Sequence, residues 1–198
     1  MNGTLRGKKL LKLALIGAMA YVVYRASKPA QTGRPHIDGL IRSDREELDR
    51  LFISGQTPTM DEMQGIYDGN ALSGVLMLNN QWVKNLINLG WLPWKGKIFE
   101  TGIGIKGKGG QGNGINRLNI GPLRFLRFQC DTQITPPLVG PNDVFRLNYD
   151  ILGNPWYIRR IRDDIKRIGD GLYLGTANFR MGSAHKFIIY FVLESKGK

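Results

Sequence analysis

The sequence predicts a mainly β protein: an antiparallel β-barrel with short helices, preceded by a single N-terminal membrane helix. Two observations lead to this prediction. An apolar run with basic flanks lies within the first 28 residues, and seven or eight β-type segments joined by short turns fill the rest. The chain therefore divides into a membrane segment at 1–28, a linker with a short amphipathic helix at 29–58, and a barrel domain at 59–198.

The N-terminal apolar run is long enough to anchor the chain in a bilayer. Residues 10–26 span 17 positions if the basic side chains of Lys12 and Arg25 reach the two interfaces, and a spanning helix needs about 17–25 residues. The residues predicted to lie in the membrane are Leu13, Leu15, Ile16, Tyr21, Val22, Val23 and Tyr24. More basic residues precede the run than follow it, which favours a cytoplasmic N-terminus.

A cleavable signal peptide is the alternative for this segment. Ala18-Met19-Ala20 matches the small-residue pattern of a cleavage site. The apolar run continues beyond Ala20, however, and ends in tyrosines that suit a membrane–water boundary. We therefore favour an uncleaved anchor, with the soluble domain on one side of the membrane.

The composition limits the function classes. Half of the net charge of +12 lies in the first 28 residues, so the remaining charge is modest and dispersed. That charge does not indicate nucleic-acid binding, although it suits lipid headgroups or an anionic ligand. The single cysteine, Cys130, excludes an internal disulfide, and two histidines are too few for the usual histidine metal site. We expect no cofactor.

Between the membrane segment and the barrel, the sequence predicts a polar linker and two helix starts. Residues 27–42 contain two prolines and two glycines, as linkers do. Capping boxes at 43–46 and 59–62 then open a short amphipathic helix and a single helical turn. Gly55 to Pro58 ends the helix, and a strand begins at Gly65.

The region before the main β segments contains most of the tryptophans. An apolar stretch at 74–78 precedes a predicted helix at 81–89, which ends at Gly90. Trp82, Trp91 and Trp94 lie in or near this helix. We favour a position in the core or as a lid over the barrel mouth; the alternative is contact with the membrane interface.

Alternation and turn residues predict the strands. We expect strands at 97–105, 115–120 and 123–132, with a glycine-rich turn at 107–114 and a proline-rich loop at 136–141. Residues 144–151 alternate, with 145, 147, 149 and 151 on the apolar face. Residues 156–168 fit a helix, or two strands that turn at Asp163-Asp164. Strands at 171–181 and 185–194 complete the pattern, with a turn at 182–183.

Two glycine–aromatic motifs resemble those of the GxWxG domain family. The motifs are Gly65-Ile-Tyr67-Asp-Gly69, with tyrosine where tryptophan is usual, and Gly90-Trp91 followed by the segment from Trp94 to Phe99. The C-terminal half is similar to the uncharacterised domain that commonly follows GxWxG, in its Tyr149-Asp150 pair, its arginine–aspartate segment and its aromatic last strand. This resemblance implies a lipocalin-like, calycin-type barrel and no defined reaction.

Other motifs have ordinary structural interpretations. Gly102 to Gly107 fits G-x-G-x-x-G, but another strand rather than a helix follows it, which favours a flexible hairpin over a nucleotide site. Asp163 and Asp164 are expected on a solvated, salt-bridged face, with a basic docking surface as the alternative. We interpret Cys130 as a small core residue and His185 as a turn or edge residue.

The leading functional prediction is a membrane-anchored, lipocalin-like barrel that binds an apolar or anionic small molecule such as a lipid or fatty acid. Its polar handle is predicted to be Tyr149, and Arg127 or Arg180 would pair with a carboxylate. The full set of predicted ligand-binding residues is Tyr67, Trp94, Arg127, Phe145, Leu147, Tyr149 and Arg180. The alternative is an accessory subunit of a membrane complex with a filled barrel. No catalytic constellation is visible.

Overall fold

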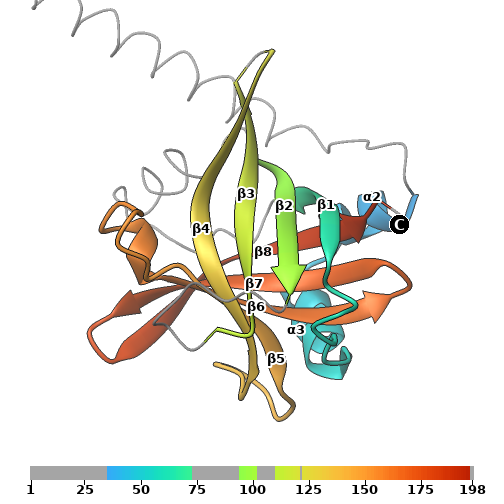
Figure 1. Ribbon diagram of the computed structural model, residues 1–198. Helices are drawn as coiled ribbons and strands as arrows, with labels where there is room; N and C mark the ends of the chain where they lie inside the picture. Colours follow the sequence, from blue (N-terminus) through green and yellow to red (C-terminus); the bar gives the residue numbers. More distant parts are fainter. Residues whose placement is uncertain (1–34, 73–93, 102–109, 121, 197–198) are drawn as a thin grey trace, which may run out of the picture. The chain divides into compact units, whose positions relative to one another are not determined.

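A closed antiparallel barrel forms the body of the protein. The computed structural model describes residues 35–72, 94–101, 110–120 and 122–196 (Figure 1). Each strand pairs with the next along the chain, and the last strand pairs with the first. The strands are β1 (Gly65–Ala71), β2 (Trp94–Thr101), β3 (Gly112–Ile120), β4 (Leu123–Thr135), β5 (Val144–Asn148), β6 (Ile161–Gly169), β7 (Leu172–Met181) and β8 (Ala184–Ser195). The predicted antiparallel barrel is confirmed.

A helix replaces part of the predicted linker. Helix α2 (Pro35–Arg42) belongs to a compact unit that is separate from the barrel domain, which begins at Ser43. Proline suits the first helical position, because its missing N–H would have no partner there. Asp38 in the first turn and Arg42 in the last complement the helix dipole. This helix was not predicted from the sequence of residues 27–42.

Helix α3 (Arg45–Ser54) lies against the outer face of the barrel. Its N-cap is Asp44, one residue later than predicted, whose side chain accepts a hydrogen bond from the Glu47 backbone N–H at 2.8 Å. Gly55 ends the helix, as the sequence indicates. Phe52 packs edge-on against Tyr190 of β8, with 6.1 Å between ring centroids. This contact covers part of the outer face of the sheet.

The second capping box is confirmed. The Glu62 backbone N–H donates to the Thr59 hydroxyl, and the Thr59 N–H donates to the Glu62 carboxylate, both at 3.2 Å. The turn leads into β1, and the Tyr67 hydroxyl donates back to the Glu62 carbonyl. The capping box thus fixes how the chain enters the barrel.

The segment at 156–168 differs most from its prediction. A short 3₁₀ helix, η1 (Ile158–Arg160), leads directly into β6, so residues 161–169 form one strand with no turn at Asp163-Asp164. The helical spacing of its apolar residues was misleading because both faces of this strand are buried. Strand β3 also begins earlier than predicted, at Gly112 rather than at Ile115.

Some predictions lie outside the described residues. These are the membrane segment, the helix at 81–89 with Trp82 and Trp91, and the G-x-G-x-x-G motif at 102–107. Within the ranges that the structure describes, no helix has both the length and the apolar character needed to cross a bilayer.

Aromatic side chains fill the barrel interior around β1 and β2. Tyr67 stacks edge-on against Phe99 and Tyr173, and Phe99 against Phe145, each with 5.5 Å between ring centroids. The ring of Trp94 lies over Gly69, where an added Cβ would come within 2.3 Å of it. Glycine at the end of the G-x-aromatic-x-G motif is therefore required by the packing of this ring.

Candidate functional site

An ion pair crosses the middle of the barrel interior. Lys97 of β2 and Asp163 of β6 lie on opposite strands of the eight-stranded ring, and their Nζ and Oδ2 atoms are 3.2 Å apart. Their side chains are 2% and 0% exposed. Water therefore reaches neither charge, and the pair depends on protein groups for its stabilisation.

The Lys97 ammonium uses all of its hydrogen-bonding capacity inside the barrel. It donates to the Asn116 side-chain oxygen at 2.8 Å and to the Tyr149 hydroxyl, in addition to its contact with Asp163. The Asn116 oxygen also accepts from the Trp94 indole N–H at 3.0 Å. An ammonium has three donors, and here it has three acceptors. Lys97 therefore connects the barrel walls and has no donor left for a ligand.

Burial dominates the electrostatics of this cluster. It raises the pKa of the Asp163 carboxyl above its ordinary value, although the nearby Lys97 charge acts in the opposite direction. Burial and then the Asp163 charge raise the pKa of the Tyr149 hydroxyl. The adjacent thiol of Cys130 has a pKa raised to about 12, again chiefly by burial. The thiol is therefore protonated at neutral pH and is not an activated nucleophile.

Asp163 and Thr132 each keep one buried oxygen without a hydrogen-bond partner among the described residues. The atoms are Oδ1 of Asp163 and Oγ1 of Thr132. Both residues occupy inward positions of the same row, on either side of Leu147 in the strand register. Because such atoms are costly to bury, this row is a poorly satisfied polar part of the described interior.

The structure brings together most of the predicted ligand-binding residues. Tyr67, Phe145, Leu147 and Tyr149 belong to one buried cluster, against which Trp94 packs. The four clustered side chains are almost fully buried, and together they occupy this part of the barrel interior. Sequence reasoning did not identify Lys97 and Asp163 as a buried ion pair. Each lies two positions from an apolar residue, Phe99 and Ile165 respectively, and this spacing indicates an inward position.

The two predicted arginines lie elsewhere. Arg127 is exposed on the β3–β4 hairpin. Arg180 lies on the outer face of β7, where its guanidinium is 3.5 Å from the Asp150 carboxylate. Neither residue joins the buried cluster that contains Tyr149.

The predicted solvated face at Asp163-Asp164 is wrong, because both carboxylates are buried. Asp163 faces the interior and Asp164 faces outward, at 0% and 1% exposure. Asp164 accepts two hydrogen bonds from Arg146 at 2.7 and 2.9 Å and one from the Leu138 backbone N–H at 2.8 Å. The proline-rich loop thus covers this part of β6, and Asp164 holds the loop in place.

Several arginines surround a single carboxylate at one end of β6 and β7. Asp150 pairs with Arg159 at 2.8 Å, with Arg180, and with Arg162 at 3.8 Å. Burial alone would raise the pKa of Asp150, but the Arg159 hydrogen bond and the surrounding positive charges lower it. Burial and the charges of Arg162, Arg146 and Arg180 also lower the pKa of His185. This end of the barrel is therefore electropositive.

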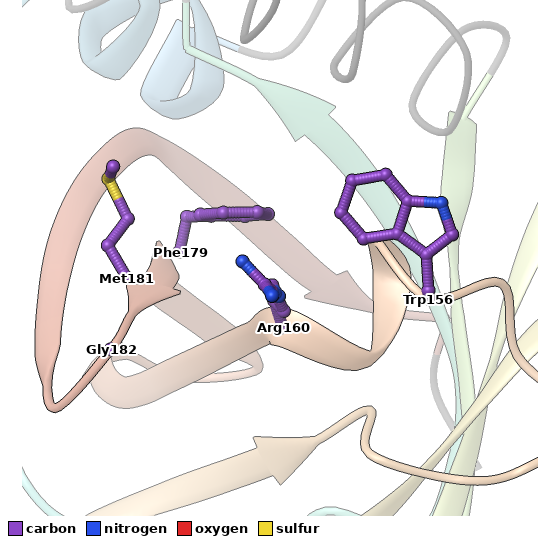
Figure 2. Close-up of a pocket in the computed structure, with 5 residues that line it drawn as sticks. All are labelled: Trp156, Arg160, Phe179, Met181 and Gly182. Carbon is purple, nitrogen blue, oxygen red and sulfur yellow. The ribbon is translucent and has the colours of Figure 1, made fainter.

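An open pocket of about 570 Å³ lies next to this electropositive region. Trp156 and Arg160 come from the segment around η1, whereas Phe179, Met181 and Gly182 come from the end of β7 and its turn (Figure 2). The Arg160 guanidinium lies 5.5 Å from the Trp156 ring centroid. Within the described part of the chain, no acidic residue pairs with Arg160. The pocket thus combines apolar walls with one available cation.

The pocket shares one residue, Phe179, with the buried core of the barrel. Phe179 is 3% exposed and pairs in register with Ile161, which belongs to the same buried cluster as Tyr149. Sequence reasoning did not identify this pocket, because two segments separated by about twenty residues form it only after the strands pair. Among the described residues, no group of histidine, cysteine and acidic side chains is arranged to hold a metal ion.

Comparisons with known proteins identify the fold and no more. No protein-family model matches the chain, and no curated protein matches it. Among solved structures, the chain is similar to the crystal structure of a protein from Thermomonospora curvata, with a TM-score of 0.53 and 14% sequence identity. The match covers 78% of this chain and 89% of the other. Similarity at this level of identity supports the barrel fold alone.

Proposed function

We propose that this chain is a membrane-anchored, lipocalin-like protein that binds an acidic amphiphile, such as a fatty acid or another lipid. The observation that carries the proposal is the pocket of about 570 Å³ lined by Trp156, Arg160, Phe179 and Met181. Ligand sites of small molecules typically enclose about 300–1,000 Å³ and combine apolar walls with a few polar groups. The volume of this open pocket falls within that range, and its walls combine apolar side chains with one guanidinium.

The chemistry of the pocket favours an anionic headgroup. A guanidinium binds carboxylate or phosphate through two parallel hydrogen bonds, and Arg160 has no acidic partner among the described residues. The neighbouring Arg159, Arg162 and Arg180 share the single carboxylate of Asp150. An anion that approaches Arg160 therefore enters a positive field, while its apolar tail meets the indole, phenyl and thioether groups.

The ligand is assigned to this pocket rather than to the centre of the barrel. Aromatic side chains and the Lys97–Asp163 pair occupy the described interior, with almost no exposed surface. In this proposal the buried cluster serves as a rigid floor, and the ligand binds at the end of the barrel beside Phe179. The membrane anchor, which rests on the sequence of residues 10–26, would hold this pocket close to a source of lipids.

A matched pair of arginine variants tests the proposal. Full-length protein in mild detergent is titrated with oleate, and binding is followed by the quenching of tryptophan fluorescence. We expect Arg160→Gln to weaken binding by about tenfold, the loss that corresponds to about 1.4 kcal/mol for one charge-assisted contact. Arg50→Gln, on an exposed position of α3, is the control and should bind as the wild type does. Equal affinities in both variants would refute the assignment of Arg160.

The second candidate function is an accessory subunit of a membrane complex. Two observations favour it: the described barrel interior is filled, and large apolar side chains remain on the surface, with Leu152 82% and Trp156 65% exposed. Such side chains are common at protein interfaces. Solubilising the native membrane in mild detergent and measuring the size of the particle that contains this chain separates the two functions. A large assembly supports the subunit, and a particle near monomer size supports the carrier.

The resemblance to the GxWxG family also remains a proposal. It is supported by the packing of Trp94 over Gly69, which gives a physical reason for glycine at that position of the motif.

A further inference from the structure

The β3–β4 hairpin extends beyond the strands on either side of it (Figure 1). The neighbouring strand β2 begins at Trp94, opposite Leu118, and β5 pairs with β4 only from Asp131 onward. Among the described residues, strand β4 from Leu123 to Cys130 therefore pairs with β3 alone. Among the described strands, the end of the hairpin is a two-stranded arm, and its base is held by Phe128, which packs against the core, and by Asn154, which donates to the Gln129 carbonyl.

The end of this arm combines apolar and basic side chains. Leu123 is 58% exposed and Leu126 is 49% exposed, and both are among the most exposed large apolar residues of the described chain. Arg124 and Arg127 each follow one of these leucines in the sequence and are also exposed. The sequence from Gly110 to Cys130 contains no acidic residue. Because side chains alternate along a strand, Leu123 and Arg127 lie on one face of the arm, and Arg124 and Leu126 lie on the other. Each face therefore combines a leucine with an arginine, and this stretch has no acidic residue to compensate the charge.

We propose that the end of the β3–β4 hairpin inserts into the interface of an anionic bilayer. The leucines would enter the boundary between headgroups and acyl chains, and Arg124 and Arg127 would bind lipid phosphates. Peripheral membrane segments bind in this way, by burying apolar side chains and by attraction between basic residues and anionic lipids. Pairing of β4 with a second copy of the chain is less favourable, because it would place the arginines of both copies in one sheet, and residues 110–130 have no acidic side chain to compensate them.

This inference rests on the membrane location in the proposed function and is independent of the ligand pocket. The hairpin and the pocket share no residues. If the chain binds to vesicles and the hairpin remains in water, the anchor is supported and the present inference fails. If the chain does not bind to vesicles at all, both fail.

A polarity-sensitive dye on the hairpin provides the test. The full-length chain carrying Leu123→Cys is labelled and reconstituted into vesicles of phosphatidylcholine and phosphatidylglycerol, with bromine atoms on the upper acyl chain as quenchers. Leu152→Cys is the control, since Leu152 is 82% exposed on a different loop. The native Cys130 is buried and should not react. We expect a blue shift and quenching at position 123 and neither at position 152.

Charge variants test the role of the arginines. Arg124→Gln and Arg127→Gln in the labelled protein should each lower the inserted fraction by about fivefold, the factor that corresponds to about 1 kcal/mol per basic residue at an anionic surface. Arg50→Gln on α3 is the control and should have no effect. Equal dye emission at positions 123 and 152 in vesicles would overturn the proposal. Burial of the dye at position 123 without vesicles, together with a doubled particle size, would also overturn it and identify a second copy as the partner.

Discussion

The ion pair between Lys97 and Asp163 gives a quantitative test of how the barrel is stabilised. Lys97→Met removes the ammonium but keeps an unbranched side chain of similar length. The buried Asp163 carboxylate would then keep only the hydrogen bond from the Tyr149 hydroxyl and would have no cation beside it among the described residues. Removing one partner of a buried ion pair costs about 3–5 kcal/mol, so we expect a loss of stability of that size.

The expected shift in melting temperature follows from the size of the domain. For 150–250 residues, 1 kcal/mol corresponds to about 2–4 °C, so Lys97→Met should lower Tm by roughly 6–20 °C. Asp163→Leu should have a similar effect, since it leaves the ammonium unpaired. The double variant should be close to the wild type or more stable, because it removes both costs of burying a charge. The two single effects are therefore strongly non-additive.

The pH dependence of this variant has a definite sign. The pKa of Asp163 is already raised in the folded protein, and loss of Lys97 raises it further, because the lysine acts to lower it. The carboxyl in the variant thus takes up a proton at higher pH than in the wild type. The stability difference between the two proteins should be largest at neutral pH, and it should shrink as the pH falls through the pKa of Asp163 in the variant.

The assay is thermal unfolding of the full-length chain in mild detergent, followed by tryptophan fluorescence. Lys186→Met, at an exposed position of β8, is the control for loss of one lysine and should change Tm by no more than about 2 °C. The reasoning is refuted if Lys97→Met melts with the wild type, or if the double variant loses the sum of the two single effects.

Three further predictions concern other parts of the barrel. Gly96→Ala should abolish folding or lower the free energy of unfolding by more than about 2 kcal/mol, because Gly96 has a φ of +125° and an added Cβ would lie 2.0 Å from a backbone carbonyl of β1. Soluble yield and Tm are the measurements, and Gly153→Ala, with open space around the added Cβ, is the control. Cys130 should resist thiol reagents at pH 8 until the protein unfolds, because its pKa is raised to about 12 and it is buried; fast modification of the native protein would contradict this. Asp164→Asn should lower the free energy of unfolding by about 1.5–3 kcal/mol, because the Leu138 N–H then loses its charged acceptor. Proteolysis within residues 136–143 should also become faster, which is tested by mapping the cleavage sites with mass spectrometry.

The sequence predicted the barrel because its signals are local. Each hairpin of this fold joins neighbouring strands, so turn residues such as Gly182-Ser183 and the alternation at Phe145 and Leu147 already determine the order of the strands. The second capping box was equally readable, since its donors and acceptors lie three residues apart. Interactions of this kind need no knowledge of distant segments.

Strand β6 shows where local reading fails. Its charged residues suggested an exposed helix or turn, yet the loop at 136–143 and helix α3 cover its outer side, while its inner side faces the core. The outward positions carry Arg162, Asp164 and Lys166, and the inward position 163 is also an aspartate, so the usual alternation of polar and apolar residues is interrupted. A buried charge is acceptable here only because specific partners meet it.

The sequence alone thus determined the class of the fold and the order of most strands. It also indicated a candidate membrane segment, which rests on the composition of residues 10–26 alone. Only the tertiary structure decided which charges meet. Lys97 and Asp163 are 66 positions apart in the printed sequence and come together because ring closure places β2 opposite β6. The pocket at Arg160 and Phe179 arises in the same way, from strand pairing, which no local pattern of residues encodes.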